Sequence, residues 1–204
     1  MKIHKYNDEY AIKNGVGGSA EFLIAILIGI IGGITPAILL GAGTIKFILA
    51  LIIWVITILL CVYFIRRFGV INKSSMSVLI EDKDDLYYMM IAPNLRGSMF
   101  PKSFTTLLAG PSAIFTENKI DAEIEATGIA QDDETVKALF ELYKSNELKT
   151  TFSTVMYGKP VYISKILEKN FKDSNKKIYK VNCVKDNGNK STVKIPKVYP
   201  TFFK

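Results

Sequence analysis

The chain opens with a polar stretch and is then apolar from Phe22 to Ile65, a segment that carries one charged residue, Lys46. Lys46 separates two apolar runs, residues 22–41 and residues 47–65, of 20 and 19 residues. A helix rises about 1.5 Å per residue, so roughly 20 apolar residues match a hydrocarbon core of about 30 Å. The pattern predicts a transmembrane helical hairpin over residues 22–65, behind an N-terminal tail formed by residues 1–21.

Beyond the hairpin, shorter hydrophobic patterns predict a small α+β domain with an antiparallel sheet over residues 72–204. Met76, Val78 and Ile80 recur at every second position, and a turn of four or five residues leads into a second strand over 86–91. Two further hairpins are predicted, one with strands at 113–116 and 119–125, the other with strands at 179–183 and 193–195.

The strongest helical pattern in this part follows the acidic stretch 131–134. Val136, Leu139, Phe140 and Tyr143 recur at i, i+3, i+4 and i+7, which predicts one buried helical face ending near Ser145. Residues 162–171 show similar spacing and are predicted as a second helix. A short helix at 103–109 and a strand at 148–157 complete the expected elements.

Flanking charges predict the orientation of the hairpin. Arg66 and Arg67 follow the second apolar run directly, and Lys2, Lys5, Lys13 and Lys73 also lie outside the hairpin, against Lys46 alone in its turn. The positive-inside rule therefore places both termini in the cytoplasm of a cell-membrane protein. A cleaved signal peptide is the alternative, but its apolar core would be too long and no A-x-A site follows it.

Small residues repeat along the first apolar run. Ala25, Gly29, Gly33, Ala37 and Gly41 are spaced four apart and line one slowly drifting helical face. Small side chains let helices approach closely in lipid. The stripe either seats the second helix of the hairpin or contacts a second copy or another membrane protein. We favour the first interpretation, because the short turn already holds the two helices together.

Charge is divided within the predicted domain. Residues 81–147 hold 13 acidic and 6 basic side chains, whereas residues 149–204 hold 13 basic and 3 acidic ones. The basic residues of the second half are all lysines, which are poor at bidentate recognition of phosphates and bases. The composition thus predicts attraction to an anionic surface such as the lipid bilayer, and no specific nucleic-acid partner.

Few residues suggest catalysis, a cofactor or a metal. His4, the one histidine, lies in the predicted tail, and Cys61 and Cys183 are too far apart in the predicted topology to form a disulfide. Asp121, Glu123 and Glu125 would share one face of a predicted strand, as a metal site or, as we favour, a solvated face. The sequence predicts no catalytic residue, cofactor or metal ligand.

The C-terminal segment is basic and aromatic. Lys197, Phe202, Phe203 and Lys204 could rest at the lipid headgroup boundary, where each lysine adds about 1 kcal/mol of attraction to anionic lipid. The two phenylalanines could equally pack into the domain core. Both alternatives stay open at this point.

Three functions fit the sequence. The first is a membrane-anchored, non-enzymatic binding or scaffold module that presents the domain at the inner membrane face to a protein partner. It predicts that the lysine-rich half faces anionic lipid and the acidic half faces away. The alternatives are a small subunit of a larger membrane complex, or a histidine-independent enzyme acting on a membrane-proximal substrate. The enzyme would require a concave pocket with convergent polar groups and shifted acidities.

Overall fold

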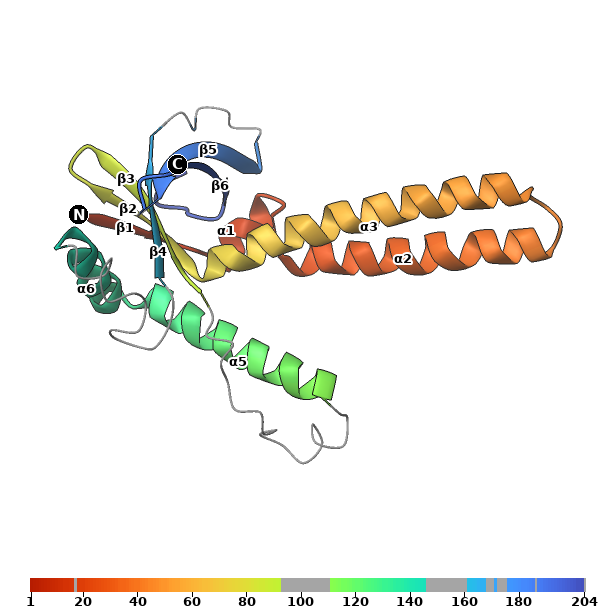
Figure 1. The fold of residues 1–204 in the computed structure, drawn as a ribbon, viewed down its shortest axis with the longest axis horizontal. Coiled ribbons are helices and arrows are strands. Elements are labelled where there is room, and N and C mark those ends of the chain that lie inside the picture. The colour runs from red at the N-terminus through yellow and green to blue at the C-terminus, as the bar shows by residue number, and fades with distance from the viewer. Residues whose placement is uncertain are drawn as a thin grey trace.

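The fold combines a long helical hairpin with a compact α+β region at one end (Figure 1). This computed structural model describes residues 1–16, 18–92, 111–145, 161–167, 171, 176–185 and 187–203. The predictions for 93–110 and for 148–157 lie outside the described residues.

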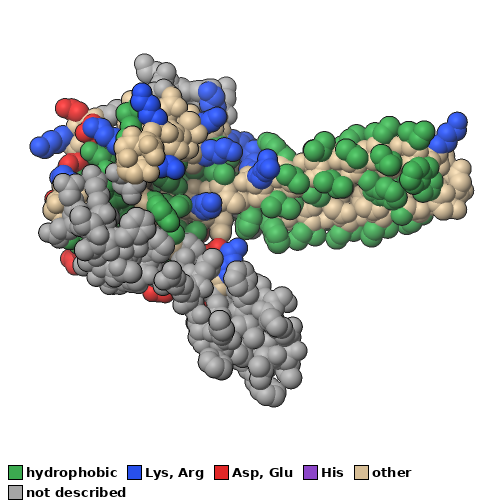
Figure 2. Space-filling model, viewed as in Figure 1, with side chains coloured by type: hydrophobic (Ala, Val, Ile, Leu, Met, Phe, Trp, Pro, Cys, Tyr) green, Lys and Arg blue, Asp and Glu red, His purple; other side chains and the backbone are tan. Residues whose placement is uncertain are grey.

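Two apolar helices form the hairpin. Helix α2 spans Gly18–Gly41 and helix α3 spans Phe47–Ser75, and both are long and apolar enough to cross a membrane. Ile31, Ile48 and Leu59 are 62%, 72% and 65% exposed. A helix in the core of a water-soluble protein would bury such residues. Figure 2 shows hydrophobic side chains along the visible length of the hairpin, with Lys and Arg gathered where it meets the α+β region.

The α+β region is built on a six-stranded antiparallel sheet in which each strand pairs with the next strand along the chain. The strands are β1 Lys2–Lys5, β2 Ser77–Asp82, β3 Asp85–Ile91, β4 Val161–Ile166, β5 Ile178–Lys185 and β6 Lys190–Pro196. This confirms the predicted antiparallel sheet and the hairpins 76–91 and 179–195. The β2–β3 turn is tighter than predicted, because Asp82 pairs with Asp85 and leaves Lys83, with φ 54°, and Asp84 as the connection.

Both faces of the sheet are covered. On one face Leu79, Tyr88 and Ile195 pack with Ile71 of α3. On the other face Val78, Ile80 and Met89 pack against helices α5 (Pro111–Gln131) and α6 (Asp133–Lys144). Successive residues of a strand point to opposite faces. All four residues from Ser77 to Ile80 are therefore buried, since each face has its own hydrophobic cluster.

The N-terminal segment is part of the sheet, so its prediction as a separate tail over residues 1–21 is corrected. Strand β1 pairs with β2, with Ile3 opposite Ile80, and helix α1 (Asp8–Lys13) follows it. His4 is 1% exposed, and its Nδ1 lies 2.8 Å from Thr201 Oγ1. The strands β1 and β2 pair although they are far apart in the sequence, and such pairing produces little local hydrophobic pattern from which β1 could be predicted. The helical hairpin is thus an insertion between two adjacent strands.

Helix α6 matches its prediction, and helix α5 replaces a predicted hairpin. Asp132 caps α6 by accepting a hydrogen bond from the Thr135 amide, and Val136, Leu139 and Phe140 are buried. In α5, however, Ala122, Ala126 and Ala130 form the buried stripe, while Ile120 and Ile124 are exposed. The alternation of isoleucine and acid that suggested a strand is therefore a surface pattern.

The acidic face predicted for residues 119–125 does not exist, because those residues are helical. Asp121 and Glu125 are one helical turn apart in α5, and Glu123 points to a different side of the helix. Glu123 instead accepts a hydrogen bond from Asn72 Nδ2 at 3.4 Å and pairs with Lys119 at 3.8 Å.

Residues 161–166 form strand β4, which corrects the helix predicted over residues 162–171. Ile163 and Ile166 have the i, i+3 spacing of a helical stripe, yet they belong to the clusters on opposite faces of the sheet. A strand buried on both faces places an apolar residue at odd and even positions alike. Its spacing can therefore imitate a helix.

Candidate ligand cleft at the base of the helical hairpin

Helix α3 continues beyond its apolar run and fastens the hairpin to the sheet. Ile71 is buried in the core cluster of that sheet face. The Ser77 hydroxyl donates to the Lys73 carbonyl at 2.6 Å, and the Tyr88 hydroxyl donates to Ser77 Oγ at 2.9 Å. This chain of bonds joins the last turn of α3 to β2 and β3. The position of the sheet relative to the hairpin is thereby fixed.

A cleft of about 690 Å³ lies beside this junction. Its described lining comes from α3 and from strands β3 to β6 and the β5–β6 turn. The apolar part includes Val70, Tyr88, Met90 and Val193. Ligand pockets typically measure about 300–1,000 Å³ and combine an apolar lining with a few polar groups. The cleft fits that description in size and composition.

The polar part of the cleft is basic and hydroxylated. Lys73 and Lys185 contribute ammonium groups, and Ser164 and Ser191 contribute hydroxyls. Lys194 also belongs to the lining. The residues that the structure describes around the cleft include no Asp or Glu. The local charge is therefore positive, which favours an anionic ligand group.

Sheet register places part of the cleft lining on the α3 side of the sheet. Val181 and Cys183 are buried on the α3 side of the sheet, and Lys185 has the same parity at the end of β5. Ser191 pairs with Cys183, and Val193 pairs with Val181, so they share that side. Lys185 thus places a charge at the end of the row of buried side chains formed by Val181 and Cys183. Both Lys73 and Lys185 are exposed, and no described residue forms an ion pair with either.

Tyr88 is the titratable group of the described lining whose acidity is shifted. Burial raises the pKa of its phenol above the ordinary value of 10.0. The hydroxyl therefore stays neutral at physiological pH. Tyr88 acts in the cleft as an apolar wall whose polar tip is already bonded to Ser77.

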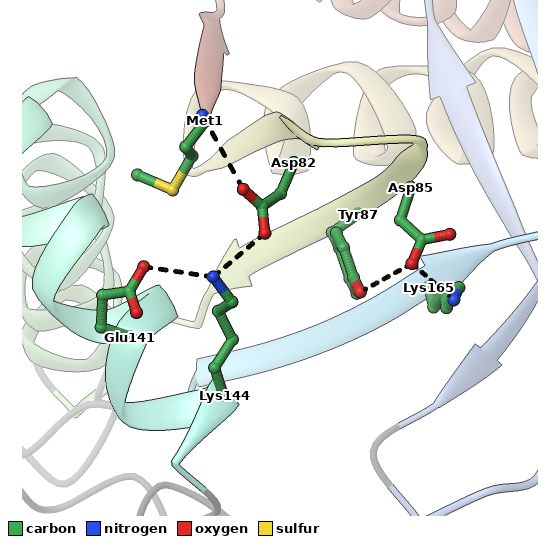
Figure 3. A network of polar contacts seen from close by, with 7 residues as sticks. All are labelled: Met1, Asp82, Asp85, Tyr87, Glu141, Lys144 and Lys165. Atoms are coloured by element: carbon green, nitrogen blue, oxygen red, sulfur yellow. Dashed lines mark hydrogen bonds and ion pairs between the residues drawn. The ribbon is translucent and has the colours of Figure 1, made fainter.

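A separate polar network lies near the β2–β3 turn (Figure 3). Asp82 lies 3.0 Å from Lys144 Nζ and 3.7 Å from the Met1 amino group, so the hydrogen bond from Lys144 holds the Asp82 pKa below its usual range. Lys165 lies 2.7 Å from Asp85, and this hydrogen bond raises the Lys165 pKa. The network joins α6, β1 and β4 to one turn. Its shifted acidities therefore follow from structural ion pairs.

One end of the predicted small-residue stripe faces α3, and the other end is exposed. Ala25 is 5% exposed, and its carbonyl accepts from Cys61 Sγ at 3.5 Å; a side chain on Gly29 would also meet that sulfur. Ala37 and Gly41 are exposed, and a Cβ on Gly33 would meet nothing within 4 Å. Four residues exceed one helical turn of 3.6, so the stripe rotates away from α3 along its length.

A close approach of the two helices, at Gly32, was not predicted from the sequence. A Cβ on Gly32 would lie 2.2 Å from Thr57 Oγ1. One turn away, the Trp54 indole donates to the Gly33 carbonyl at 3.0 Å. Spacing of 3.6 rather than 4 along the apolar run would have pointed to Gly32, because Ala25, Gly29, Gly32 and Pro36 recur at i, i+4, i+7 and i+11.

The C-terminal aromatic residues lie inside the protein. Phe203 is 6% exposed in the core cluster and stacks on Tyr179 with ring centroids 5.2 Å apart. Phe202 is half-buried, and its ring meets the edge of His4 at 5.3 Å. Lys197 is half-buried, and Lys204 lies outside the described residues. Of the two alternatives for this segment, Phe203 thus adopts core packing and is not available at the surface.

The two arginines predicted to set the orientation lie at the base of the hairpin. Arg66 is exposed, and Arg67 Nη2 donates to the Gly15 carbonyl at 3.4 Å, which ties the end of one helix to the approach of the other. The cleft lysines were not predicted as a site. Their only sequence signal is the charge at Lys185 that continues the buried alternation Tyr179, Val181, Cys183.

In comparisons with known proteins, no family, curated protein or solved structure matches the chain. By its fold, the protein is an α+β protein in which an apolar two-helix hairpin is inserted between adjacent strands of an antiparallel sheet.

Proposed function

We propose that the protein is a membrane-anchored, non-enzymatic binding module whose hairpin crosses the cell membrane and whose α+β region lies at the cytoplasmic face. The observation that carries this proposal is the position of the cleft. The hairpin surface is apolar along its length, and the cleft begins on α3 shortly after Arg66 and Arg67.

Depth along α3 relates the cleft to the bilayer. With Arg66 at the edge of the hydrocarbon core, Val70 lies about 6 Å further along the helix axis and Lys73 about 10 Å. The headgroup layer adds roughly 5–8 Å on each side of the core. Val70 therefore lies at headgroup depth, and Lys73 lies just beyond the headgroup layer. A ligand in the cleft would be in contact with the membrane surface.

The pairing of β1 with β2 supports a location of both termini on the same side of the membrane. Strand β1 precedes the hairpin and β2 follows it, and the two are hydrogen-bonded neighbours. Chain ends that meet in one sheet must return to the same side of a bilayer. The positive charges flanking the hairpin favour the cytoplasmic side for that sheet.

Topology labelling tests this proposal. In a background with Cys61→Ala and Cys183→Ala, we would compare Thr44→Cys, in the exposed turn between the helices, with Asp84→Cys, in the exposed β2–β3 turn. A membrane-impermeant maleimide should modify only the Thr44→Cys protein in intact cells, and both proteins after permeabilisation. Labelling of the Asp84→Cys protein in intact cells would overturn the proposed sidedness.

A binding role accounts for the acidities better than a catalytic one. The enzyme alternative requires a concave pocket with shifted acidities, and the cleft supplies the concavity. In the described part of the chain, however, the shifted carboxyl and ammonium groups are Asp82, Lys144 and Lys165 of the network in Figure 3 and Asp132, which caps α6. They do not line the cleft.

A second candidate function is that of a subunit in a larger membrane complex or a homo-oligomer. It is favoured by the uncovered small-residue face at Gly33, Ala37 and Gly41. Replacing Gly33 with Ile adds bulk at a position where a Cβ would meet no atom within 4 Å. Loss of a detergent-stable complex on a native gel would support this candidate, and an unchanged complex would exclude this face as its contact.

A further inference from the structure

We propose that the cleft binds one anionic phospholipid taken from the bilayer that the hairpin crosses. The phosphate lies at Lys73 and Lys185, and the first part of an acyl chain packs against the apolar wall, which we define as Val70, Tyr88, Met90 and Val193. This inference rests on the proposed membrane position. The chemistry recognised is a phosphate joined to an apolar chain, and the membrane is the source to which the proposal commits.

Charge complementarity selects an anionic ligand. Lys73 comes from α3 and Lys185 from the end of β5, so two separate elements bring their charges to one cleft. No Asp or Glu belongs to its described lining, so the lysines set the charge of the part that the structure describes. Lysine is a compact point charge that suits a single phosphate rather than a planar group held bidentately. The hydroxyls of Ser164 and Ser191 add hydrogen-bond donors for phosphate oxygens.

The apolar wall selects an amphiphile over a free anion. Val70, Met90 and Val193 line the same cleft, and Tyr88 keeps its hydroxyl bonded to Ser77. A small hydrated anion gains nothing from these side chains. An amphiphile buries methylene groups against these side chains and should therefore bind more tightly than a free phosphate.

The geometry of the hairpin supplies the route. Val70 is both a cleft residue and, in the proposed orientation, a residue at headgroup depth on α3. A lipid beside α3 could therefore enter the cleft by moving its headgroup outward along one helix face. Its acyl chain would leave the hydrocarbon core only in part, which keeps the cost of transfer low.

Binding to the full chain in a neutral detergent tests the proposal. The probes are short-chain phosphatidylglycerol, short-chain phosphatidylcholine and inorganic phosphate, with melting temperature and native mass spectrometry as readouts. We expect phosphatidylglycerol to bind and raise the melting temperature, and the other two probes to bind at least tenfold more weakly. Equal binding of phosphatidylcholine would overturn the role of the lysines. Equal binding of inorganic phosphate would overturn the lipid as occupant.

Two variants that remove the same charge distinguish binding in the cleft from general electrostatic attraction of the anionic lipid to the protein. The double variant Lys73→Gln/Lys185→Gln should bind phosphatidylglycerol about 30-fold more weakly, which corresponds to about 2 kcal/mol for two lysines. Lys180 and Lys190 are exposed on the same β-hairpin and do not belong to the described cleft lining. The control Lys180→Gln/Lys190→Gln removes the same charge and should bind within twofold of the unmodified protein. Equal weakening in both variants would overturn the cleft as the site.

The labelling experiment on Thr44→Cys and Asp84→Cys is independent of this one. Correct sidedness without phosphatidylglycerol binding would leave the anchored module standing and remove the lipid ligand. Reversed sidedness would remove the proposed function even if the cleft bound phosphatidylglycerol in detergent.

Discussion

The carboxylate of Asp82 lies between two cationic groups at the tip of the β2–β3 hairpin. One oxygen lies 3.7 Å from the Met1 amino nitrogen and the other 3.0 Å from Lys144 Nζ (Figure 3). Lys144 also lies 3.4 Å from Glu141 on its own helix. Asp82 therefore joins the N-terminal strand and α6 to the same turn, although all these groups reach the surface.

The lowered Asp82 pKa gives a prediction with a definite sign. A carboxyl whose pKa is depressed in the folded state contributes stability above its unfolded value of 3.8, and that contribution is lost as pH falls through the lower folded value. We expect Asp82→Asn to lower the free energy of unfolding at pH 7. The difference from the unmodified protein should shrink steadily below pH 3.8. Urea denaturation followed by circular dichroism at several pH values measures both quantities.

Asp84→Asn is the control for this prediction. Asp84 is exposed in the same turn, and no ion pair within the described residues involves it. Its substitution should change the stability little at either pH. A pH-independent difference for Asp82→Asn would mean that its ion pairs do not contribute to stability.

At the scale of elements, the packing of α2 on α3 depends on a glycine outside the predicted stripe. A Cβ on Gly32 would lie 2.2 Å from Thr57 Oγ1, 2.7 Å from its Cγ2 and 3.0 Å from its Cβ. Thr57 is branched at Cβ, and its hydroxyl already donates to the Ile53 carbonyl at 2.8 Å. The threonine has little freedom to move, so the helices themselves would have to separate.

Gly32→Ala should therefore destabilise the helical hairpin by about 1–3 kcal/mol, the usual cost of overpacking. Gly33→Ala is the matched control, because its Cβ would meet no atom within 4 Å and alanine favours helix formation. Trp54, the one tryptophan of the chain, bonds to the Gly33 carbonyl and reports this interface through its fluorescence. Thermal unfolding in detergent with tryptophan emission should rank Gly32→Ala below Gly33→Ala. The reverse order would contradict the close approach at Gly32.

The elements also show where sequence patterns succeed. Helix α6 was predicted because Val136, Leu139 and Phe140 are large and all face one cluster. Helix α5 was missed because its buried stripe consists of alanines, whose hydrophobic signal is weaker than that of the exposed Ile120 and Ile124. Periodicity follows hydrophobicity, and it fails where small residues form the contact.

At the scale of the whole molecule, the two ends of the hairpin are held together by the α+β region. Val16 and Ile71 are buried in one core cluster, and Arg67 donates to the Gly15 carbonyl at 3.4 Å. Tyr10 donates to the Phe203 carbonyl, which joins α1 to the C-terminal segment. The segments before and after the hairpin thus form one folded unit.

This arrangement predicts how the chain can be divided. A protein in which a short Gly/Ser linker replaces residues 18–65 should be soluble and retain the sheet, because β1 still pairs with β2. Residues 72–204 alone should be much less stable, because they lack β1, α1 and Ile71 from the core. Gel filtration and thermal melts followed by circular dichroism would compare the two. Equal stability would contradict a structural role for the N-terminal segment.

The helical hairpin could be predicted from the amino-acid pattern alone, since an uninterrupted apolar run needs no distant partner to be recognised. So could α6 and the hairpins 76–91 and 179–195, whose patterns arise from neighbouring residues. The positions of β1, His4 and Phe203 became clear only from the folded chain, because their partners are distant in sequence and such pairing produces no local periodicity. The cleft could not be predicted for the same reason, because Lys73 and Lys185 line one cavity only when α3 packs across the sheet.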